Sequence, residues 1–151
     1  MTAELRDLYQ EVILDHQKRP RNFRGMEGAD RTARGHNPLC GDKVTVYLKL
    51  QDGALSDVSF EGVGCAICTA AASMMTNEVK GKPIGDVEKL FDAFHGFLTG
   101  EEGEDGQQEL PGKLRVFEGV RRFPIRVKCA TLPWHTLRAA VRGGEEPVTT
   151  E

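Results

Sequence analysis

The spacing of hydrophobic residues near the start of the chain is that of an amphipathic helix. Apolar side chains recur every three or four positions between residues 3 and 17, and Thr2 stands where an N-cap is needed. Pro20 ends this pattern, because proline lacks the backbone donor and disfavours helix in the residue before it. Residues 21–39 are polar, with scattered glycine and proline. We predict a helix over residues 3–17 and a long loop over residues 21–39.

The pattern then changes to the alternation that is typical of strands. Apolar side chains alternate with polar or smaller ones over residues 43–50, which predicts a half-buried strand. Asp52-Gly53 follows, a pair that favours tight hairpin turns. A second strand then runs through Val58 and Phe60. The first half of the chain therefore predicts a small antiparallel sheet.

Helical spacing dominates the second half of the chain. A segment rich in alanine and methionine over residues 66–80 predicts one helix, and residues 86–98 predict another with Asp86 as its cap. A short amphipathic piece and a last helix follow, marked by Leu114, Phe117, Val120, Leu132, Leu137 and Val141. We place Pro133 in or near the first turn of that last helix, where a missing backbone donor costs least.

Two segments carry too little apolar side chain to pack. Residues 99–112 are acidic and glycine-rich, which predicts a flexible surface insertion, and residues 143–151 form a short tail. The pattern shows neither an internal repeat nor a second domain, so we expect residues 1–151 to form one domain. Because strands precede most of the helices, we expect an α+β fold with helices on one face of a small antiparallel sheet.

Composition narrows the classes of function. The chain has 151 residues, of which 39% are hydrophobic and 28% charged, and its formal net charge is −3. This charge provides no positive field for nucleic acid or an anionic membrane, so we expect neither as a partner. No apolar run approaches the roughly 20 residues that span a bilayer. The charged N-terminus has no apolar signal core, and we expect a cytoplasmic protein.

The four cysteines are the candidate chemistry. Cys40 lies in the turn before the first predicted strand, Cys65 directly before the Ala-rich helix, and Cys129 near the start of the last helix. The ends of three elements can meet at one end of a sheet, and Asp42 stands two residues from Cys40. Three thiolates and a carboxylate would suit a tetrahedral zinc site. The long segments between these residues leave other interpretations open, since a lone cysteine is often a small buried hydrophobe.

Cys65 and Cys68 form a C-x-x-C motif, which is found in redox pairs and in halves of zinc knuckles. A redox pair normally follows a strand in a βαβ unit, and a knuckle needs a second pair of ligands; the sequence predicts neither. We therefore favour a packing role for Cys68 over a role as a metal ligand. A thiol redox protein that uses Cys65 and Cys68 remains a third hypothesis.

Several motifs together resemble one known family. "DHQKRPRN" (15–22), "NPLCGD" (37–42), "GVGCAICTAAASMM" (62–75) and "RVKCATLPW" (126–134) occur in the order found in the IscU-like family of iron–sulfur cluster assembly proteins, also called the IscU/NifU-N family. The resemblance runs from about residue 5 to residue 141. It implies an IscU/SufE-like α+β fold, in which a small antiparallel three-stranded sheet packs against several helices.

Two departures from the scaffold members indicate the SufU branch. Lys128 stands where scaffold proteins carry a histidine before the third cysteine, and the acidic stretch from Thr99 onward resembles an insertion of the SufU branch. The Leu-Pro-Pro motif that an Hsp70-type chaperone recognises is also missing.

The resemblance implies a ligand set and a reaction. Cys40, Asp42, Cys65 and Cys129 match the zinc ligands of SufU-like proteins, and Cys40 matches the cysteine that receives sulfur. The implied function is a zinc-dependent sulfur acceptor, a sulfurtransferase-type protein that takes persulfide sulfur from a pyridoxal-phosphate cysteine desulfurase of the SufS type. A SufBCD-type cluster scaffold or iron–sulfur apoproteins would be further partners. The alternative is a scaffold that binds iron and assembles an iron–sulfur cluster, which is a carrier and not an enzyme.

Overall fold

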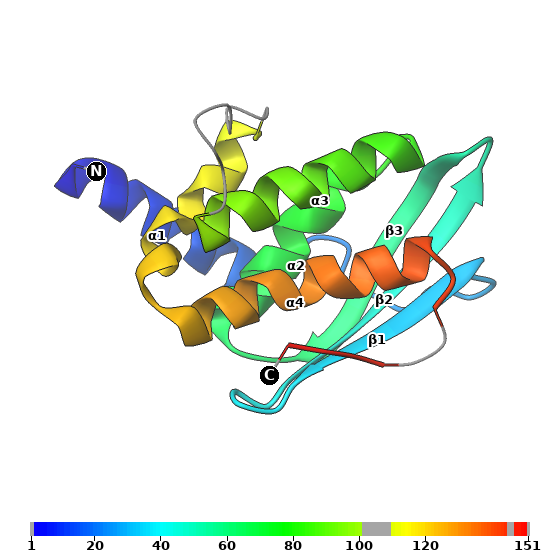
Figure 1. Ribbon diagram of the computed structural model, residues 1–151, viewed down its shortest axis with the longest axis horizontal. Coiled ribbons are helices and arrows are strands. Elements are labelled where there is room, and N and C mark those ends of the chain that lie inside the picture. The colour runs from blue at the N-terminus through cyan, green and yellow to red at the C-terminus, as the bar shows by residue number, and fades with distance from the viewer. Residues whose placement is uncertain (1, 101–109, 145–146, 151) are drawn as a thin grey trace.

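The computed structural model describes residues 2–100, 110–144 and 147–150. It has an α+β architecture in which helices cover one face of a twisted sheet (Figure 1). Two of these helices lie directly on the sheet, and the others pack against them. The sheet and the helices share one continuous hydrophobic core. Within these residues, no helix is both long and apolar enough to cross a membrane.

The sheet contains four strands in the spatial order β3-β2-β1-β4. Their bounds are Arg31–Asn37 for β1, Asp42–Gln51 for β2, Ala54–Val63 for β3 and Val148–Thr149 for β4. The first three form the expected antiparallel sheet, and the two-residue β4 adds a parallel edge. The Asp52-Gly53 turn between β2 and β3 has positive φ at both residues (53° and 78°), as a tight hairpin requires.

The prediction of a loop throughout residues 21–39 was wrong, because β1 lies within it. The residues of β1 that face inward are Ala33, Gly35 and Asn37, and they alternate with charged or polar residues that are more exposed. Two small residues and an amide give almost no hydrophobic alternation, so the sequence pattern did not reveal a strand. Its pairing with β2 makes residues 38–41 a short hairpin loop.

The first two helices pack against each other. They are α1, Ala3–Lys18, which begins where predicted, with the Thr2 hydroxyl accepting a hydrogen bond from the Leu5 N–H (3.1 Å), and α2, Ala66–Val79. The end of α1 is tied to α2 through Ser73, whose hydroxyl is 2.7 Å from His16 Nδ1 and accepts a bond from the Arg21 N–H at 2.8 Å.

The remaining helices depart from prediction at their starts. Helix α3, Ile84–Thr99, is preceded by Pro83, so Asp86 lies inside its first turn and is not its cap. A 3₁₀ segment η1, Gly112–Arg122, buries the predicted short amphipathic piece. Helix α4, Pro124–Val141, begins at a different proline from the one predicted, so Pro133 lies in its interior.

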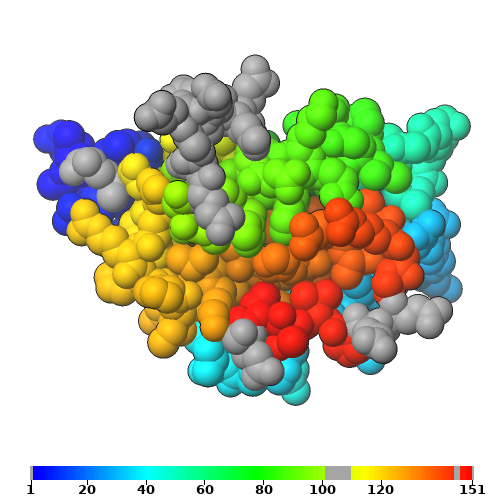
Figure 2. All heavy atoms as spheres, in the orientation of Figure 1, coloured from blue at the N-terminus to red at the C-terminus, as the bar shows by residue number. Residues whose placement is uncertain are grey.

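Residues 148–150, within the predicted tail, lie against β1 and α4. Strand β4 pairs with Gly35 and His36 of β1, and the Thr150 hydroxyl lies 3.4 Å from the Lys128 carbonyl of α4. Figure 2 shows these last residues, in red, on the surface beside α4. Most of the predicted acidic insertion, residues 101–109, lies outside the described residues.

Candidate metal centre

Three segments that are distant in the sequence meet at one end of the molecule. They are the loop between β1 and β2, the connection from β3 to α2, and the first half of α4 (Figure 1). Each of them contributes a cysteine. Cys40 Sγ and Cys129 Sγ lie 3.2 Å apart, and Cys65 Sγ lies 3.9 Å from Asp42 Oδ2.

Asp42 is buried because of its position in β2. Alternate residues of the strand, from Asp42 through Val44, Val46 and Leu48, face the core. A carboxylate at the start of that row points in the same direction as the valines after it. Asp42 is fully buried and accepts a hydrogen bond from the Cys65 N–H (2.8 Å).

Glycines permit the close approach of these segments. Gly41, between Cys40 and Asp42, has φ of +70°, a left-handed conformation that favours glycine. This agrees with the predicted tight turn. Gly64 precedes Cys65, and a Cβ there would lie only 2.9 Å from Asp42 Oδ1. The backbone before Cys65 can therefore reach the carboxylate only without a side chain at position 64.

The N-terminus of α2 fixes Cys65. This cysteine is the N-cap of the helix, and its Sγ accepts a hydrogen bond from the Cys68 N–H (3.4 Å). Its own N–H is bound to Asp42, as described above. Two contacts therefore fix its backbone and its sulfur.

The amide of Asn37 links the hairpin loop to α4. Its Nδ2 group points toward Cys129 Sγ (3.6 Å), and its Oδ1 accepts a hydrogen bond from the Leu39 N–H (3.2 Å). Asn37 is fully buried opposite Asp42 in the β1–β2 pair. Asn37 belongs to the NPLCGD motif, and no role was predicted for it. The Asn-Pro pair, which often begins a turn, was the available signal.

The donor set fits a cation. The sulfurs of Cys40 and Cys129 and a carboxylate oxygen of Asp42 all lie within 4.8 Å of one another, and Cys65 borders this cluster. None of the ion pairs among the described residues involves Asp42, although it is fully buried. Burial and the neighbouring Asp42 and Cys40 raise the pKa of Cys129 well above its usual range. A bound cation would compensate this accumulation of acidic groups.

Cys68 lies beside the cluster but is not part of it. It is 3% exposed, in agreement with its interpretation as a packing residue. Burial, followed by the nearby Asp42, Cys65 and Cys40, raises its pKa far above the usual value for a thiol. Thiolate ligands select zinc, iron–sulfur clusters or Cu(I), whereas Cu(II) and Ni(II) prefer nitrogen and oxygen ligands.

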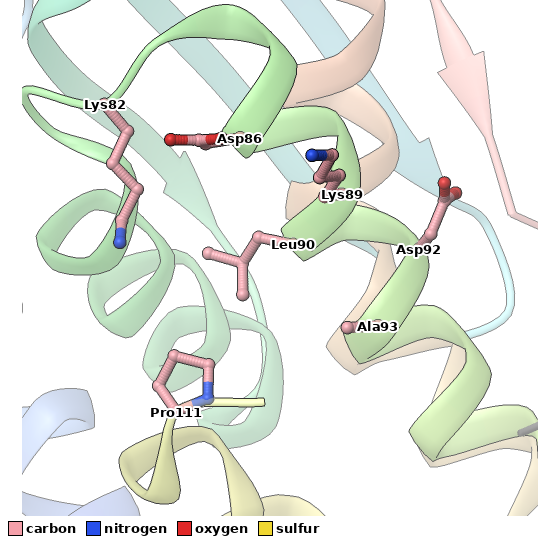
Figure 3. A pocket seen from close by; sticks show the side chains of 7 residues that line it. All are labelled: Lys82, Asp86, Lys89, Leu90, Asp92, Ala93 and Pro111. Atoms are coloured by element: carbon pink, nitrogen blue, oxygen red, sulfur yellow. The ribbon is translucent and has the colours of Figure 1, made fainter. Parts of the chain in front are cut away.

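Two hollows in the surface of the described residues lie away from the thiols. One of about 810 Å³ lies along α3, where Figure 3 shows Leu90 between Lys82 and Pro111, and no cysteine lines it. A second, of about 450 Å³, includes Lys128 and His135 in its lining but no cysteine. The cysteines of the cluster therefore line neither of these two hollows.

Comparison with known proteins identifies the family of the chain. Residues 8–130 match the family described as the NifU-like N terminal domain. This match covers most of the chain, so the protein belongs to that family.

Its relatives carry two different functional names. The chain is 40% identical over 139 residues to the zinc-dependent sulfurtransferase SufU of Bacillus subtilis. This match covers 92% of each of the two chains. It is 37% identical over 140 residues to the iron–sulfur cluster assembly scaffold protein IscU of Streptococcus pyogenes, covering 93% of this chain and 86% of that one. A crystal structure described as a putative iron–sulfur cluster assembly scaffold protein for the SUF system, from Fervidobacterium islandicum, superposes with a TM-score of 0.79. It is 33% identical, and the match covers 87% of this chain and 94% of that one.

Proposed function

We propose that this protein is a zinc-dependent sulfur acceptor in iron–sulfur cluster assembly. The observation that carries the proposal is the group formed by Cys40, Asp42 and Cys129, with Cys65 beside it. These four residues would hold the zinc. When bound, zinc would keep the thiols deprotonated at neutral pH and offset their charge.

Cys40 is the best acceptor among the three thiols near the metal. It is partly exposed, whereas Cys129 is fully buried. It lies on a short hairpin loop beside the left-handed Gly41, and its N–H makes a long bond of 3.3 Å to Asn37 O. Cys65 is partly exposed too, but its N–H and its sulfur are both engaged at the start of α2.

The transfer itself needs a Cys40 thiolate that has been released from the metal. The Cys40 sulfur attacks the outer sulfur of a persulfide on the donor protein, a new S–S bond forms on Cys40, and the donor leaves as a thiolate. Bringing two macromolecules together in this way requires a docking surface around Cys40.

Each of the three thiol-bearing segments carries an exposed apolar side chain close in sequence to its cysteine. Leu39, next to Cys40, is 58% exposed, and Val63, at the end of β3, is 77% exposed. Ile125, one helical turn before Cys129, is 54% exposed. Large apolar groups left in water beside a reactive site are typical of a protein-docking surface. They support a protein donor, which we propose is a pyridoxal-phosphate cysteine desulfurase of the SufS type. SufBCD-type scaffolds or iron–sulfur apoproteins would take the sulfur onward.

A cluster scaffold is the second candidate, and the relatives that are named as scaffolds favour it. The same three cysteines could bind iron and sulfide. Lys128 weighs against this function, because an ammonium group is a poor iron ligand and its side chain lines the hollow between α3, α4 and β4.

The test is the rate of alanine release by a SufS-type desulfurase in the presence of this protein. We expect strong acceleration by the zinc-loaded protein and little by the zinc-stripped protein. Cys40→Ser should abolish acceleration and the persulfide on this chain, detected by alkylation and mass spectrometry, even if zinc remains bound. Cys68→Ala is the matched control, because it removes a neighbouring thiol from outside the ligand group.

The opposite results decide against the proposal. If neither form accelerates the cognate desulfurase, while iron and sulfide assemble a cluster on the protein, the scaffold function is correct. If Cys40→Ser still accepts sulfur, another cysteine is the acceptor.

A further inference from the structure

We propose that Cys65 and Cys68 form a reversible dithiol–disulfide pair that gives this protein a second, redox function. The pair would be oxidised by a low-molecular-weight disulfide. Its oxidation would remove Cys65 from the metal ligands. The disulfide itself does not depend on the proposed sulfur transfer; only its effect on zinc and sulfur acceptance rests on that proposed function.

The position of the two residues on α2 brings them together. Cys65 is the N-cap and Cys68 is the third residue of the helix, and the Cys68 N–H points at Cys65 Sγ (3.4 Å). In one turn of helix, Cα atoms three residues apart are about 5 Å from each other. A disulfide accepts Cα separations of about 4.4–6.8 Å, so this spacing is compatible with a disulfide between the two residues.

The Cys68 side chain faces the cluster and not the opposite side of α2. A Cβ placed on Gly64 would lie 3.3 Å from Cys68 Cβ and 2.9 Å from Asp42 Oδ1. Cys68 therefore lies across Gly64 from the buried carboxylate. Among the four cysteines it is also the one outside the proposed ligand set. It would remain a free thiol beside the site when the metal is bound.

The unequal exposure of the two thiols assigns their roles. Cys65 is partly exposed and can meet an oxidant from solution, while Cys68 is 3% exposed and can meet only its neighbours. In a C-x-x-C pair the accessible thiol usually attacks the oxidant first, and the buried thiol then resolves the mixed disulfide.

The reaction balances with one molecule of the low-molecular-weight disulfide. The Cys65 thiolate attacks one sulfur of the disulfide. A mixed disulfide forms on Cys65, and the first small thiol leaves as a thiolate, which takes a proton from water. The Cys68 sulfur then attacks the Cys65 sulfur, and the second small thiol leaves with the proton of Cys68. Two protein thiols are oxidised, and one disulfide is reduced to two thiols.

A competing pair is present in the same cluster. Cys40 Sγ and Cys129 Sγ lie 3.2 Å apart, closer than the separation of about 3.8 Å that two sulfurs on one tetrahedral zinc would have. Both residues are proposed ligands, so joining them would replace two metal–sulfur bonds at once. Joining Cys65 to Cys68 would replace only one. This difference favours Cys65–Cys68 in the metal-loaded protein.

The experiment uses the full, zinc-loaded chain in glutathione buffers of increasing oxidised fraction. Samples are quenched with acid, alkylated, digested and mapped by mass spectrometry, while released zinc is measured with a chelating dye. We expect an intramolecular disulfide within the peptide that holds Cys65 and Cys68, parallel release of zinc, and reversal of the disulfide on reduction. Cys40 and Cys129 should be recovered as alkylated thiols in the samples where the first disulfide appears.

Cys68→Ala is the decisive variant, and Cys68→Ser is a second choice if alanine weakens the fold. Neither variant should form the disulfide of the Cys65 peptide. Release of the same amount of zinc should need at least about tenfold more oxidised glutathione, because the resolving thiol otherwise acts at a high effective concentration. Zinc release equal to that of the unmodified protein would overturn the proposal, as would a Cys40–Cys129 disulfide formed first.

Sulfur acceptance under reducing conditions separates this proposal from the proposed function. The reduced Cys68→Ala protein should accept sulfur as well as the parent does. If the reduced parent accepts none, the proposed function fails, and the disulfide map still decides whether Cys65 and Cys68 form a redox pair.

Discussion

Asn37 makes two side-chain contacts that link the hairpin loop to α4. Its carbonyl oxygen holds the Leu39 N–H within the hairpin loop, and its amide nitrogen points toward the sulfur of Cys129. The side chain is fully buried, so neither contact is exchanged with water at low cost. Asn37 therefore keeps the loop that carries Cys40 in position against α4.

Asn37→Asp separates the two contacts. Aspartate keeps an oxygen for Leu39 but removes the donor to Cys129 and adds a second buried carboxylate. We expect zinc affinity to fall by about 10- to 100-fold, as for other lost contacts around metal ligands. Competition with a chelator of known affinity measures this change.

Asn37→Ser is the control, because it can still accept a bond in the turn without adding charge. We expect Asn37→Ser to lose about 1–3 kcal/mol of stability through the unsatisfied groups it leaves. Zinc affinity equal to that of the parent in Asn37→Asp would mean that the contact with Cys129 has no influence on the metal.

The residues of the site were predictable to different degrees. The motifs implied Cys40, Asp42 and Cys129, and the structure brings these three together. The same resemblance implied Cys65 as a ligand, which stays a prediction, although Cys65 lies beside the cluster. Asn37 could not be selected, because a polar residue in an unrecognised strand gives no sign of which face it occupies.

At the scale of the elements, the site depends on how closely β1 approaches α4. A Cβ on Gly35 would lie 2.0 Å from Thr136 Oγ1 and 3.0 Å from Leu132 Cδ1. Glycine is required at position 35 because a side chain there would clash with α4, and not because the backbone is left-handed. This approach brings Asn37, two residues further along β1, to the level of Cys129 on α4.

Gly35→Ala should therefore separate strand and helix. We expect the free energy of unfolding to fall by about 1–3 kcal/mol, the usual cost of overpacking. Denaturant unfolding of the metal-free protein measures it. Thr136→Ala removes the nearest atom, so the double variant should recover part of the loss.

Strictly additive losses in the double variant would contradict this steric explanation.

Gly35 also illustrates why β1 was missed: the contact that requires glycine lies on α4, about 100 residues away along the chain, and leaves no local signal.

Pro133 shows a similar limit for the last helix. A backbone N–H at residue 133 would bind the carbonyl of Cys129, four residues earlier, and proline has none. We placed Pro133 in a first turn to avoid this cost. The helix instead begins at Pro124 and keeps Pro133 buried in its interior, so tertiary packing outweighs local propensity. The other helices and the β2–β3 hairpin were predictable because each has its own periodicity and turn.

At the scale of the whole molecule, the proposed metal would join three parts of the chain. The ligands come from the β1–β2 loop, the start of α2 and α4. An unfolded chain would not bring these groups together, so zinc would bind the native state preferentially.

We expect zinc to raise the free energy of unfolding by about 2.7 kcal/mol at 100 times its Kd. For a chain of this size, this corresponds to a rise in Tm on the order of 5–10 °C. Calorimetry with increasing zinc measures the shift, and Asp42→Asn should reduce it by removing the charge of one ligand. An unchanged Tm in the unmodified protein would show that no stabilising site forms.

The stability of the metal-free protein should also depend on pH through His135. This half-buried histidine of α4 lies between Phe91 and His95 of α3, with ring centroids 5.2 and 5.3 Å away. Burial, with the nearby charges of His95 and Arg138, lowers the pKa of His135 from 6.5 to about 4. The unfolded chain therefore binds a proton at this residue between about pH 6.5 and pH 4, while the folded chain does not.

This difference makes stability fall as the pH decreases through that range. The stabilisation is complete above pH 6.5 and is lost progressively toward about pH 4. The partial exposure of the ring limits the change to about 1–2 kcal/mol. We would measure urea unfolding from pH 7 to pH 4.5 with a chelator and a reductant present, so that loss of metal does not contribute. His135→Gln should flatten the dependence, since glutamine has no proton to gain. An equally steep dependence in this variant would assign the effect to other groups, such as His16, whose pKa burial also lowers.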